Sequence, residues 1–143
     1  MLLCMMYELL VIIVLAAAGF LISLRIHRSK KTGEKLVCFI GGGKKSCNEV
    51  VESEYSKTLG IPNEVAGMVY YASVFIFALG FVFVPDILGS SFLWAAKISS
   101  GAAFLASMYF VGIQAFVLKK FCEWCLATAV INTLIFGINW MFF

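Results

Sequence analysis

The stretch that decides the fold is LLVIIVLAAAGFLISL, from Leu9 to Leu24, which is apolar almost without interruption. A helix needs about 20 such residues to cross the hydrocarbon core of a bilayer, so this stretch and its flanks predict a membrane span over residues 7–24. A cleaved secretory signal is the alternative, but no basic residue precedes the run, where such signals carry positive charge. Three further apolar runs follow, over residues 65–84, 92–118 and 121–143.

The composition agrees with a membrane protein. Of the 143 residues, 62% are hydrophobic and 13% are charged, and the mean hydropathy is +0.98. A soluble domain is nearer half apolar and a quarter charged. Four spans use about 80 residues and leave about 60, which excludes a separate folded soluble domain, and a chain this apolar cannot be disordered. We expect one all-α domain over residues 1–143, a four-transmembrane-helix bundle in the lipid bilayer that binds no nucleic acid.

The four spans determine which segments share a side of the membrane. The long first loop, residues 25–64, lies on the same side as the Lys119–Lys120 turn, and both termini lie on the other side with the turn at Pro85. The first loop contains Cys38 and Cys47, separated by FIGGGKKS. We therefore expect a bundle that is capped by this loop, with the loop cysteines on the same face as the start of the fourth span.

A CxxC motif, Cys122-Glu123-Trp124-Cys125, opens that fourth span. Positions three apart share a face of a helix, so the two sulfurs can meet. The positive field of a helix amino terminus, with two lysines just before it, favours a thiolate and hence thiol–disulfide exchange. A loop dithiol above a helix dithiol predicts that electrons pass from the loop into the bundle.

Two other interpretations of these four cysteines remain open. They could bind zinc, although the spacing is not that of a zinc ribbon and we expect no metal site. They could also form two inert structural disulfides. The fifth cysteine, Cys4, lies at the opposite end of the first span, about 30 Å away, and is expected to take no part.

Taken together, these features resemble the vitamin K epoxide reductase (VKOR) family over nearly the whole chain. The shared residues are Cys38, Cys47, Ser53, Gly60-Ile61-Pro62-Asn63, Gly67, Tyr71, the Cys122–Cys125 motif and Asn132. The resemblance implies a bundle around a quinone, which could be menaquinone, ubiquinone or a quinone of the vitamin K type. It also implies that Cys125 faces the quinone, that Cys122 exchanges with Cys47, and that Cys38 accepts electrons from a partner protein.

The resemblance also suggests roles for three polar residues, each of which has a simpler explanation. Ser53 matches a family Ser/Thr near the reactive sulfurs, but could be a solvated loop residue. Asn63 matches a quinone-binding position and can donate from its amide, but could equally cap the second span. Tyr71 matches a second position in the quinone pocket and could be plain packing. Asn132, inside the fourth span, is expected to hydrogen-bond inward because a lipid-facing amide is costly.

One departure from the family bears on the substrate. The animal enzymes have a tyrosine four residues after the CxxC motif, where this chain has Ala129. This favours the microbial branch, which resembles the bacterial oxidase DsbB and oxidises a thioredoxin-like protein, here a soluble partner in trans. The alternatives are a vitamin K quinone or epoxide reductase, a structural scaffold, and a small four-span transporter. The last is disfavoured because no span carries a central Asp or Glu.

The basic residues are distributed unevenly. Ten of the eleven fall on the cysteine side: Arg25, Arg28, Lys30, Lys31, Lys35, Lys44, Lys45, Lys57, Lys119 and Lys120. The first loop is short enough for the positive-inside rule, which places the cysteines in the cytosol. Most members of the family are taken to face the exterior, periplasm or lumen, where disulfides persist. The alternative is that a folded loop, partly neutralised by its glutamates, escapes the rule.

Overall fold

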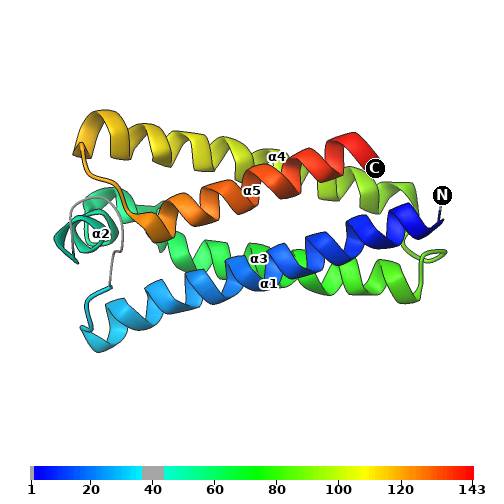
Figure 1. Ribbon diagram of the computed structural model, residues 1–143, viewed down its shortest axis with the longest axis horizontal. Helices are drawn as coiled ribbons and strands as arrows, with labels where there is room; N and C mark the ends of the chain where they lie inside the picture. Colours follow the sequence, from blue (N-terminus) through cyan, green and yellow to red (C-terminus); the bar gives the residue numbers. More distant parts are fainter. Residues whose placement is uncertain (1, 37–43) are drawn as a thin grey trace.

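The computed structural model describes residues 2–36 and 44–143 (Figure 1). Cys38 lies outside the described residues, and Cys47 is described by its backbone alone. Four long helices form the molecule: α1 (Leu2–Thr32), α3 (Asn63–Phe83), α4 (Gly89–Gly112) with its π-helical continuation η2 (Ile113–Leu118), and α5 (Glu123–Phe142). All four are long and apolar enough to cross a membrane. The predicted all-α fold with four membrane helices is confirmed.

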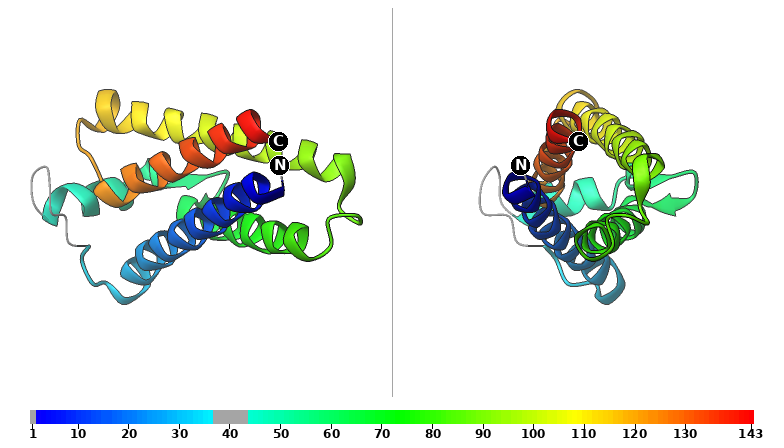
Figure 2. Two further views of the ribbon diagram at one scale, coloured as in Figure 1. Left: turned by 45° about the vertical axis from the view of Figure 1, so that its right-hand side comes forward. Right: turned by 90° about the vertical axis from the view of Figure 1, so that its right-hand side faces the viewer.

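The helices surround a central space rather than forming two flat layers. Helix α1 packs against α3 and α5, and α4 packs against α5, whereas α3 and α4 meet mainly through the rings of Phe77, Phe81 and Phe92. The view along the bundle shows this arrangement (Figure 2, right). Both termini lie at one end with the α3–α4 turn, while the first loop and the end of η2 lie at the other (Figure 1). The prediction of which segments lie at the same end of the bundle is therefore confirmed.

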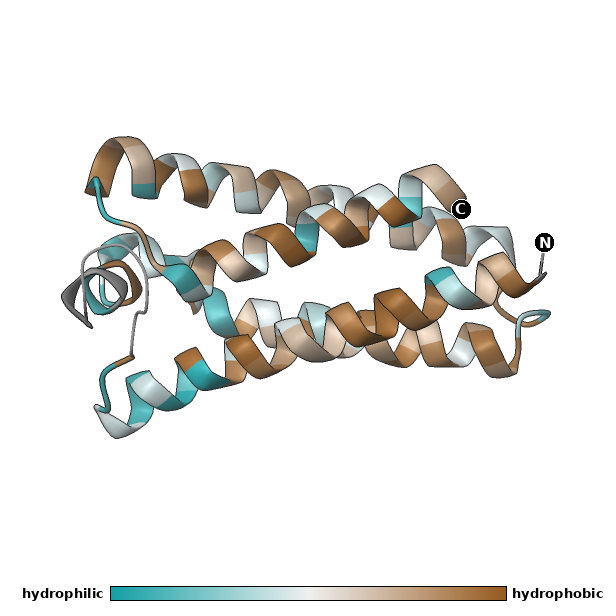
Figure 3. Ribbon diagram, viewed as in Figure 1, coloured by the Kyte–Doolittle hydropathy of each residue, from teal (hydrophilic) through white to brown (hydrophobic). Residues whose placement is uncertain are grey.

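Helix α1 extends beyond the predicted span of residues 7–24 in both directions, and it begins at Leu2. Helix α1 continues to Thr32, eight residues beyond the predicted end at residue 24, and stops before Gly33, which adopts a positive φ of 74° that favours glycine. These added turns are polar, and Figure 3 shows that hydrophilic residues gather at this end. The apolar run therefore predicts the part of α1 that can lie in the hydrocarbon core of the bilayer, and the helix continues beyond it with polar residues.

The starts of α4 and α5 also differ from the predicted spans, in opposite directions. Helix α4 begins at Gly89, three residues before the predicted 92. Helix α5 begins at Glu123, two residues after the predicted 121. The delay arises because Lys119 adopts the left-handed conformation (φ 53°), which ends η2 and leaves a short extended segment before α5.

The first loop is itself ordered where it is described. It contains α2 (Lys44–Val51), a 3₁₀ turn η1 (Glu54–Ser56), and two paired two-residue strands, β1 (Lys57–Thr58) and β2 (Ile61–Pro62). The predicted catalytic loop of residues 25–64 is accordingly shorter, because α1 and α3 take up both of its ends. The part of it from α2 to β2 lies across one end of the bundle, as the predicted cap requires (Figure 1).

One close approach fixes how α1 meets α3. The ring of Tyr71 lies so near Gly19 that a Cβ atom at this position would come within 2.5 Å of it. Tyr71 is 1% exposed and packs with Ile131 and Ile135 of α5. A glycine is thus required at position 19 for three helices to share this tyrosine.

Candidate active site

Cys122 occupies the N-cap position of α5, in an extended conformation just outside the helix. Its side chain is fully buried, and its Sγ accepts a hydrogen bond from the Cys125 backbone N–H at 3.4 Å. The predicted proximity of the two sulfurs holds, although Cys122 is a cap and not a helical residue. As an N-cap, the sulfur lies at the positive end of the helix dipole.

A glutamine that the sequence analysis did not single out holds this segment in place. Gln114, buried in η2, accepts a hydrogen bond through Oε1 from the Cys122 N–H at 2.9 Å. Its backbone carbonyl accepts another from the Lys120 N–H at 3.1 Å. A glutamine inside an apolar helix is costly unless it is bonded, and that is the signal that could have revealed it. The π-helical turn is also a feature frequent at functional sites.

The environment of Cys122 favours its thiolate. The hydrogen bond from the Cys125 thiol lowers the pKa of Cys122, and the backbone N–H groups of Cys125 and Trp124 act in the same direction, against the opposing effect of burial. The thiolate is the form that attacks a disulfide. Cys122 is therefore suited to thiol–disulfide exchange.

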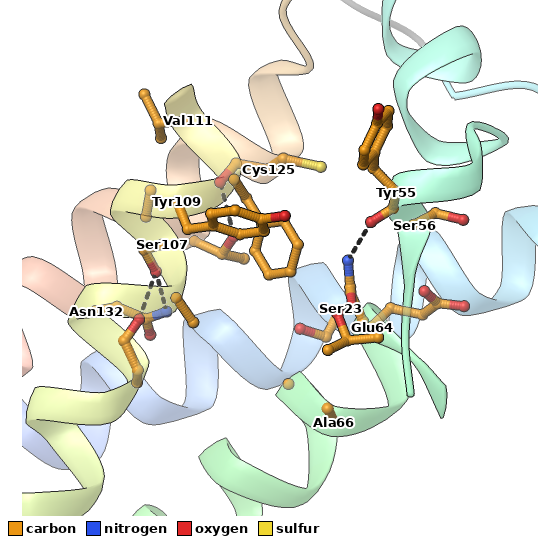
Figure 4. Close-up of a pocket in the computed structure, with 18 of the residues that line it drawn as sticks. Ser23, Tyr55, Ser56, Glu64, Ala66, Ser107, Tyr109, Val111, Cys125 and Asn132 are labelled. Atoms are coloured by element: carbon orange, nitrogen blue, oxygen red, sulfur yellow. Dashed lines mark hydrogen bonds between the residues drawn. The ribbon is translucent and has the colours of Figure 1, made fainter. Parts of the chain in front are cut away.

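Cys125 lines a cavity of about 780 Å³ that lies between the helices beneath the first loop. Its walls are mainly apolar and come from α1, α3, α4 and α5, while Val51 and Tyr55 close it from the loop. Figure 4 shows the Cys125 sulfur directed toward the loop residues Tyr55 and Ser56. A volume of this size with apolar walls and a few polar groups suits a planar organic ligand.

Comparison with known families decides what kind of site this is. Residues 10–140 match the sequence model of the Vitamin K epoxide reductase family. The chain belongs to this family. Members of the family are quinone-linked thiol–disulfide oxidoreductases, so this chain is an enzyme of that kind and a multi-pass membrane protein.

The cavity fits the quinone that a VKOR enzyme uses. Besides its volume, it has Tyr70 among its lining residues, and the hydroxyl oxygen of this tyrosine is buried with no hydrogen-bond partner in the described part of the chain. A buried hydroxyl without a partner is unfavourable, and a bound carbonyl oxygen would supply the partner. Tyr70 was not among the predicted site residues.

The three polar residues suggested by the family resemblance all line the cavity. Ser53 donates its hydroxyl to the Val50 carbonyl at 2.7 Å, which closes the end of α2. Asn63 donates its amide to the Tyr55 carbonyl at 2.9 Å and accepts from the Thr58 hydroxyl at 2.8 Å. Asn63 does not cap α3, whose N-cap residue is Pro62 without a side-chain bond. One N–H of its amide is left for a ligand.

Tyr71 and Asn132 form one network that ties three helices together. The Tyr71 hydroxyl lies 2.6 Å from Asn132 Oδ1 and 3.3 Å from the Thr128 carbonyl. The Asn132 amide donates to the Ser107 hydroxyl at 2.7 Å, which in turn donates to the Ala103 carbonyl. The prediction that Asn132 bonds inward is confirmed. Tyr71 both packs in the core and lines the cavity, so the two interpretations of it coexist.

The loop packs directly over Cys122. Leu36, Val50 and Val51 form one buried cluster with Cys122 and Ile26.

The Asn48 side chain holds two loop segments together. It accepts from the Leu36 N–H at 3.1 Å and donates to the Leu36 carbonyl at 3.3 Å. Asn48 directly follows Cys47, and Leu36 lies two residues before Cys38. The chain segments that lead to both loop cysteines are thus fastened to each other and to Cys122.

A charged pair fixes α2 at the start of α5. Glu49 of α2 accepts a hydrogen bond from the Lys120 ammonium, and both side chains are about half exposed. Each partner lies two residues from a cysteine, Cys47 in one case and Cys122 in the other. This pair orients the loop helix over the CxxC motif. Cys4, by contrast, is exposed near the amino terminus, at the other end of the bundle.

Proposed function

We propose that this VKOR enzyme forms disulfide bonds in a soluble thioredoxin-like protein and passes the electrons to a membrane quinone. Electrons enter at Cys38 and Cys47, move to Cys122 and Cys125, and leave to the quinone pool. The observation that carries the proposal is the place of Cys122, which is packed on one side against the loop and lies next to Cys125, a lining residue of the cavity.

The loop side of the reaction is two successive thiol–disulfide exchanges. The Cys47 thiolate attacks the Cys122 sulfur of the Cys122–Cys125 disulfide, and Cys125 leaves as a thiolate. Cys38 then attacks Cys47, which closes the loop disulfide and releases Cys122 as a thiolate. The partner dithiol reduces the loop disulfide again and becomes oxidised. The two exchanges together move one electron pair from the loop cysteines to the Cys122–Cys125 pair, and each requires a thiolate in line with a disulfide.

On the cavity side, a quinone accepts two electrons and two protons when the Cys122–Cys125 dithiol becomes a disulfide. Cys125 is the cysteine that lines the cavity, so it is the one we assign to contact the quinone. Tyr71, fixed by Asn132, forms one wall, and the spare amide N–H of Asn63 is a donor for a quinone oxygen. Ser53 supports the end of α2 beside them.

The microbial, DsbB-like type of activity is favoured over reduction of vitamin K epoxide. Ala129 lines the cavity where the animal enzymes carry a tyrosine, so no hydroxyl is available at this position. The cavity itself is compatible with menaquinone, ubiquinone or a quinone of the vitamin K type.

The charge distribution supports a cytosolic active face. Ten of the eleven basic residues belong to the loop end of the bundle, and the remaining one, Lys97, lies in α4 over the rings of Trp94 and Trp140. Reporters fused to the carboxyl terminus, active on one side of the membrane only, test this orientation. We expect the carboxyl terminus outside the cytosol, and a cytosolic carboxyl terminus would contradict it.

The activity is tested by mixing the purified protein with a reduced thioredoxin-like protein and analogues of menaquinone and ubiquinone. Quinone absorbance and the thiol content of the partner are followed together. We expect one disulfide to form in the partner for each quinol. A protein that forms no quinol with any quinone would remove the proposed function, and quinol formation without partner oxidation would remove its direction.

A further inference from the structure

A buried group of ionisable side chains lies where α1 meets α3, and the electron path described above does not use it. Lys30 Nζ lies 3.0 Å from Glu64 Oε2, and His27 Nδ1 lies 3.7 Å from Glu64 Oε1. The Glu64 side chain is 4% exposed, whereas those of Lys30 and His27 are 21% and 26% exposed. The carboxylate is therefore enclosed, whereas its two partners are partly exposed.

This ion pair is not explained by stability. Removing two charges from water costs about as much as their attraction returns, so a buried pair contributes little net stability. Its place in the molecule is more informative. Lys30 and Glu64 both line the cavity, and among its described lining residues they are the two that carry a formal charge. Cys125 of α5 lines the same cavity. The pair and Cys125 thus border one cavity, and Figure 4 shows Glu64 and Cys125 on different helices around it.

His27 connects this pair to the outer part of the helix. It is not among the residues that line the cavity, and its Nδ1 is buried without a hydrogen-bond partner in the described part of the chain. An imidazole nitrogen can take up a proton near neutral pH and release it to a carboxylate. His27, Glu64 and Lys30 follow one another from the partly exposed histidine to the cavity.

We propose that His27, Glu64 and Lys30 form a proton relay that supplies one of the two protons needed to reduce the quinone; the relay rests on the proposed function. It would serve a cavity whose other described walls are mainly apolar and carry no charge. A positioned proton donor of this kind typically accelerates a reaction by about 10²–10⁴-fold.

The atoms and electrons balance when the cysteine pair starts as one thiolate, on Cys122, and one thiol, on Cys125. Formation of the S–S bond releases two electrons and the Cys125 thiol proton, all of which pass to the quinone. The second proton comes from the Lys30 ammonium. Lys30 recovers it from Glu64 after His27 has protonated the Glu64 carboxylate, and His27 is reprotonated from water. The products are one disulfide and one quinol.

The relay is tested with Glu64→Gln and a matched control, Glu34→Gln, whose carboxylate pairs with Arg25 at 3.7 Å but is 70% exposed. Single-turnover reduction of a menaquinone analogue by the pre-reduced protein should slow about 10²-fold in E64Q and stay unchanged in E34Q. Reduction of the Cys122–Cys125 disulfide by dithiothreitol needs no quinone and should remain within about threefold of the wild-type rate in both.

Two further variants separate the relay from a structural role. Lys30→Met/Glu64→Gln removes both charges and avoids an unpaired buried lysine, and it should be as slow in quinol formation as E64Q. His27→Ala should also be slow, and added imidazole should restore most of its rate. Wild-type quinol formation in E64Q or in the double variant would overturn the relay. So would an equal loss of dithiothreitol exchange, because it would show a general disturbance of the cysteine site. If the wild-type protein forms no quinol at all, it is the proposed function that fails, and the relay with it.

Discussion

The two ends of the bundle are stabilised in different ways. At the loop end, polar contacts dominate, and all the ion pairs of the described residues lie there. At the end with the termini, Leu9, Ile12 and Ala78 form an apolar cluster with aromatic side chains such as Phe81 and Phe143. A smaller cavity of about 320 Å³ lies at that end, and its mainly apolar lining includes Ser73, Ser99 and Asn139.

This difference indicates that the loop end holds the reacting groups and that the packed helix faces stabilise the bundle. Directional contacts fix a sulfur or a carboxylate at one position, which redox chemistry requires, whereas apolar packing holds helices together with less directional demand. Substitutions at the loop end should therefore alter electron transfer, and substitutions among packed helix faces should alter stability.

Loss of a cysteine should reduce activity at the loop end of the bundle and leave it unchanged at the end with the termini. Cys125→Ser removes the sulfur that lines the cavity and should reduce quinol formation by about 10³-fold or more, because the residue takes part in bond formation. Cys4→Ser, at the opposite end, should leave the rate unchanged. Quinone absorbance with a reduced dithiol protein measures both. Equal activity of Cys125→Ser and wild type would contradict this difference between the two ends.

Gly19 lies on the packed face between α1 and α3, and its replacement should affect stability first. In Gly19→Ala the new Cβ meets the Tyr71 ring, and the resulting overpacking should lower the free energy of unfolding by about 1–3 kcal/mol. Gly101→Ala is the matched control, because its Cβ would lie 3.7 Å from Phe136 in ordinary contact. Thermal unfolding in detergent measures both, and equal stability of the two variants would show that the Gly19 contact is dispensable.

The charge state of Cys122 offers a prediction about pH. A lowered pKa means that the Cys122 thiolate persists to lower pH than an ordinary thiolate. We would measure it in a variant in which every cysteine except Cys122 and Cys125 is replaced by Ser. The ultraviolet absorbance of the thiolate should disappear only below the ordinary titration range of a thiol. The Cys125 thiol is the largest cause, so Cys125→Ala should move the titration of Cys122 upward. An unchanged midpoint in this variant would assign the shift to the helix terminus alone. The extra stability from the thiolate should likewise be present at high pH and be lost as the pH falls through the lowered pKa.

The smallest effect is expected for the pair that orients α2. Glu49→Lys should slow exchange between the loop and Cys122 by about two- to fivefold, because a half-exposed ion pair contributes up to about 1 kcal/mol. Combining it with Lys120→Glu should restore the rate, and added salt should weaken both the loss and the recovery. Rates of dithiol-dependent quinol formation at two salt concentrations measure this. A double variant as slow as the single one would show that the pair does not orient the loop.

The sequence predicts the fold well because apolar runs of span length have few other uses. It also predicts the cysteine pair at α5 and the inward bond of Asn132, since both follow from local spacing or from the cost of a polar group in lipid. It does not predict that Gln114 holds Cys122 or that Asn48 fastens Leu36, because these partners lie eight and twelve residues apart in different elements, outside the regular spacing of one helix. The family resemblance points to Asn63, but its partners in the loop depend on a hairpin too short to predict.

The central claim is that Cys122 receives electrons from Cys47, and disulfide trapping tests it most directly. A Cys38→Ser/Cys125→Ser variant leaves Cys47 and Cys122 as the only cysteines of the two pairs, and a Cys47→Ser/Cys125→Ser variant leaves Cys38 and Cys122. After mild oxidation, mass spectrometry of the digested proteins should find the Cys47–Cys122 disulfide in most molecules of the first variant and little Cys38–Cys122 disulfide in the second. Absence of the Cys47–Cys122 bond, or equal formation of both, would contradict the proposed path.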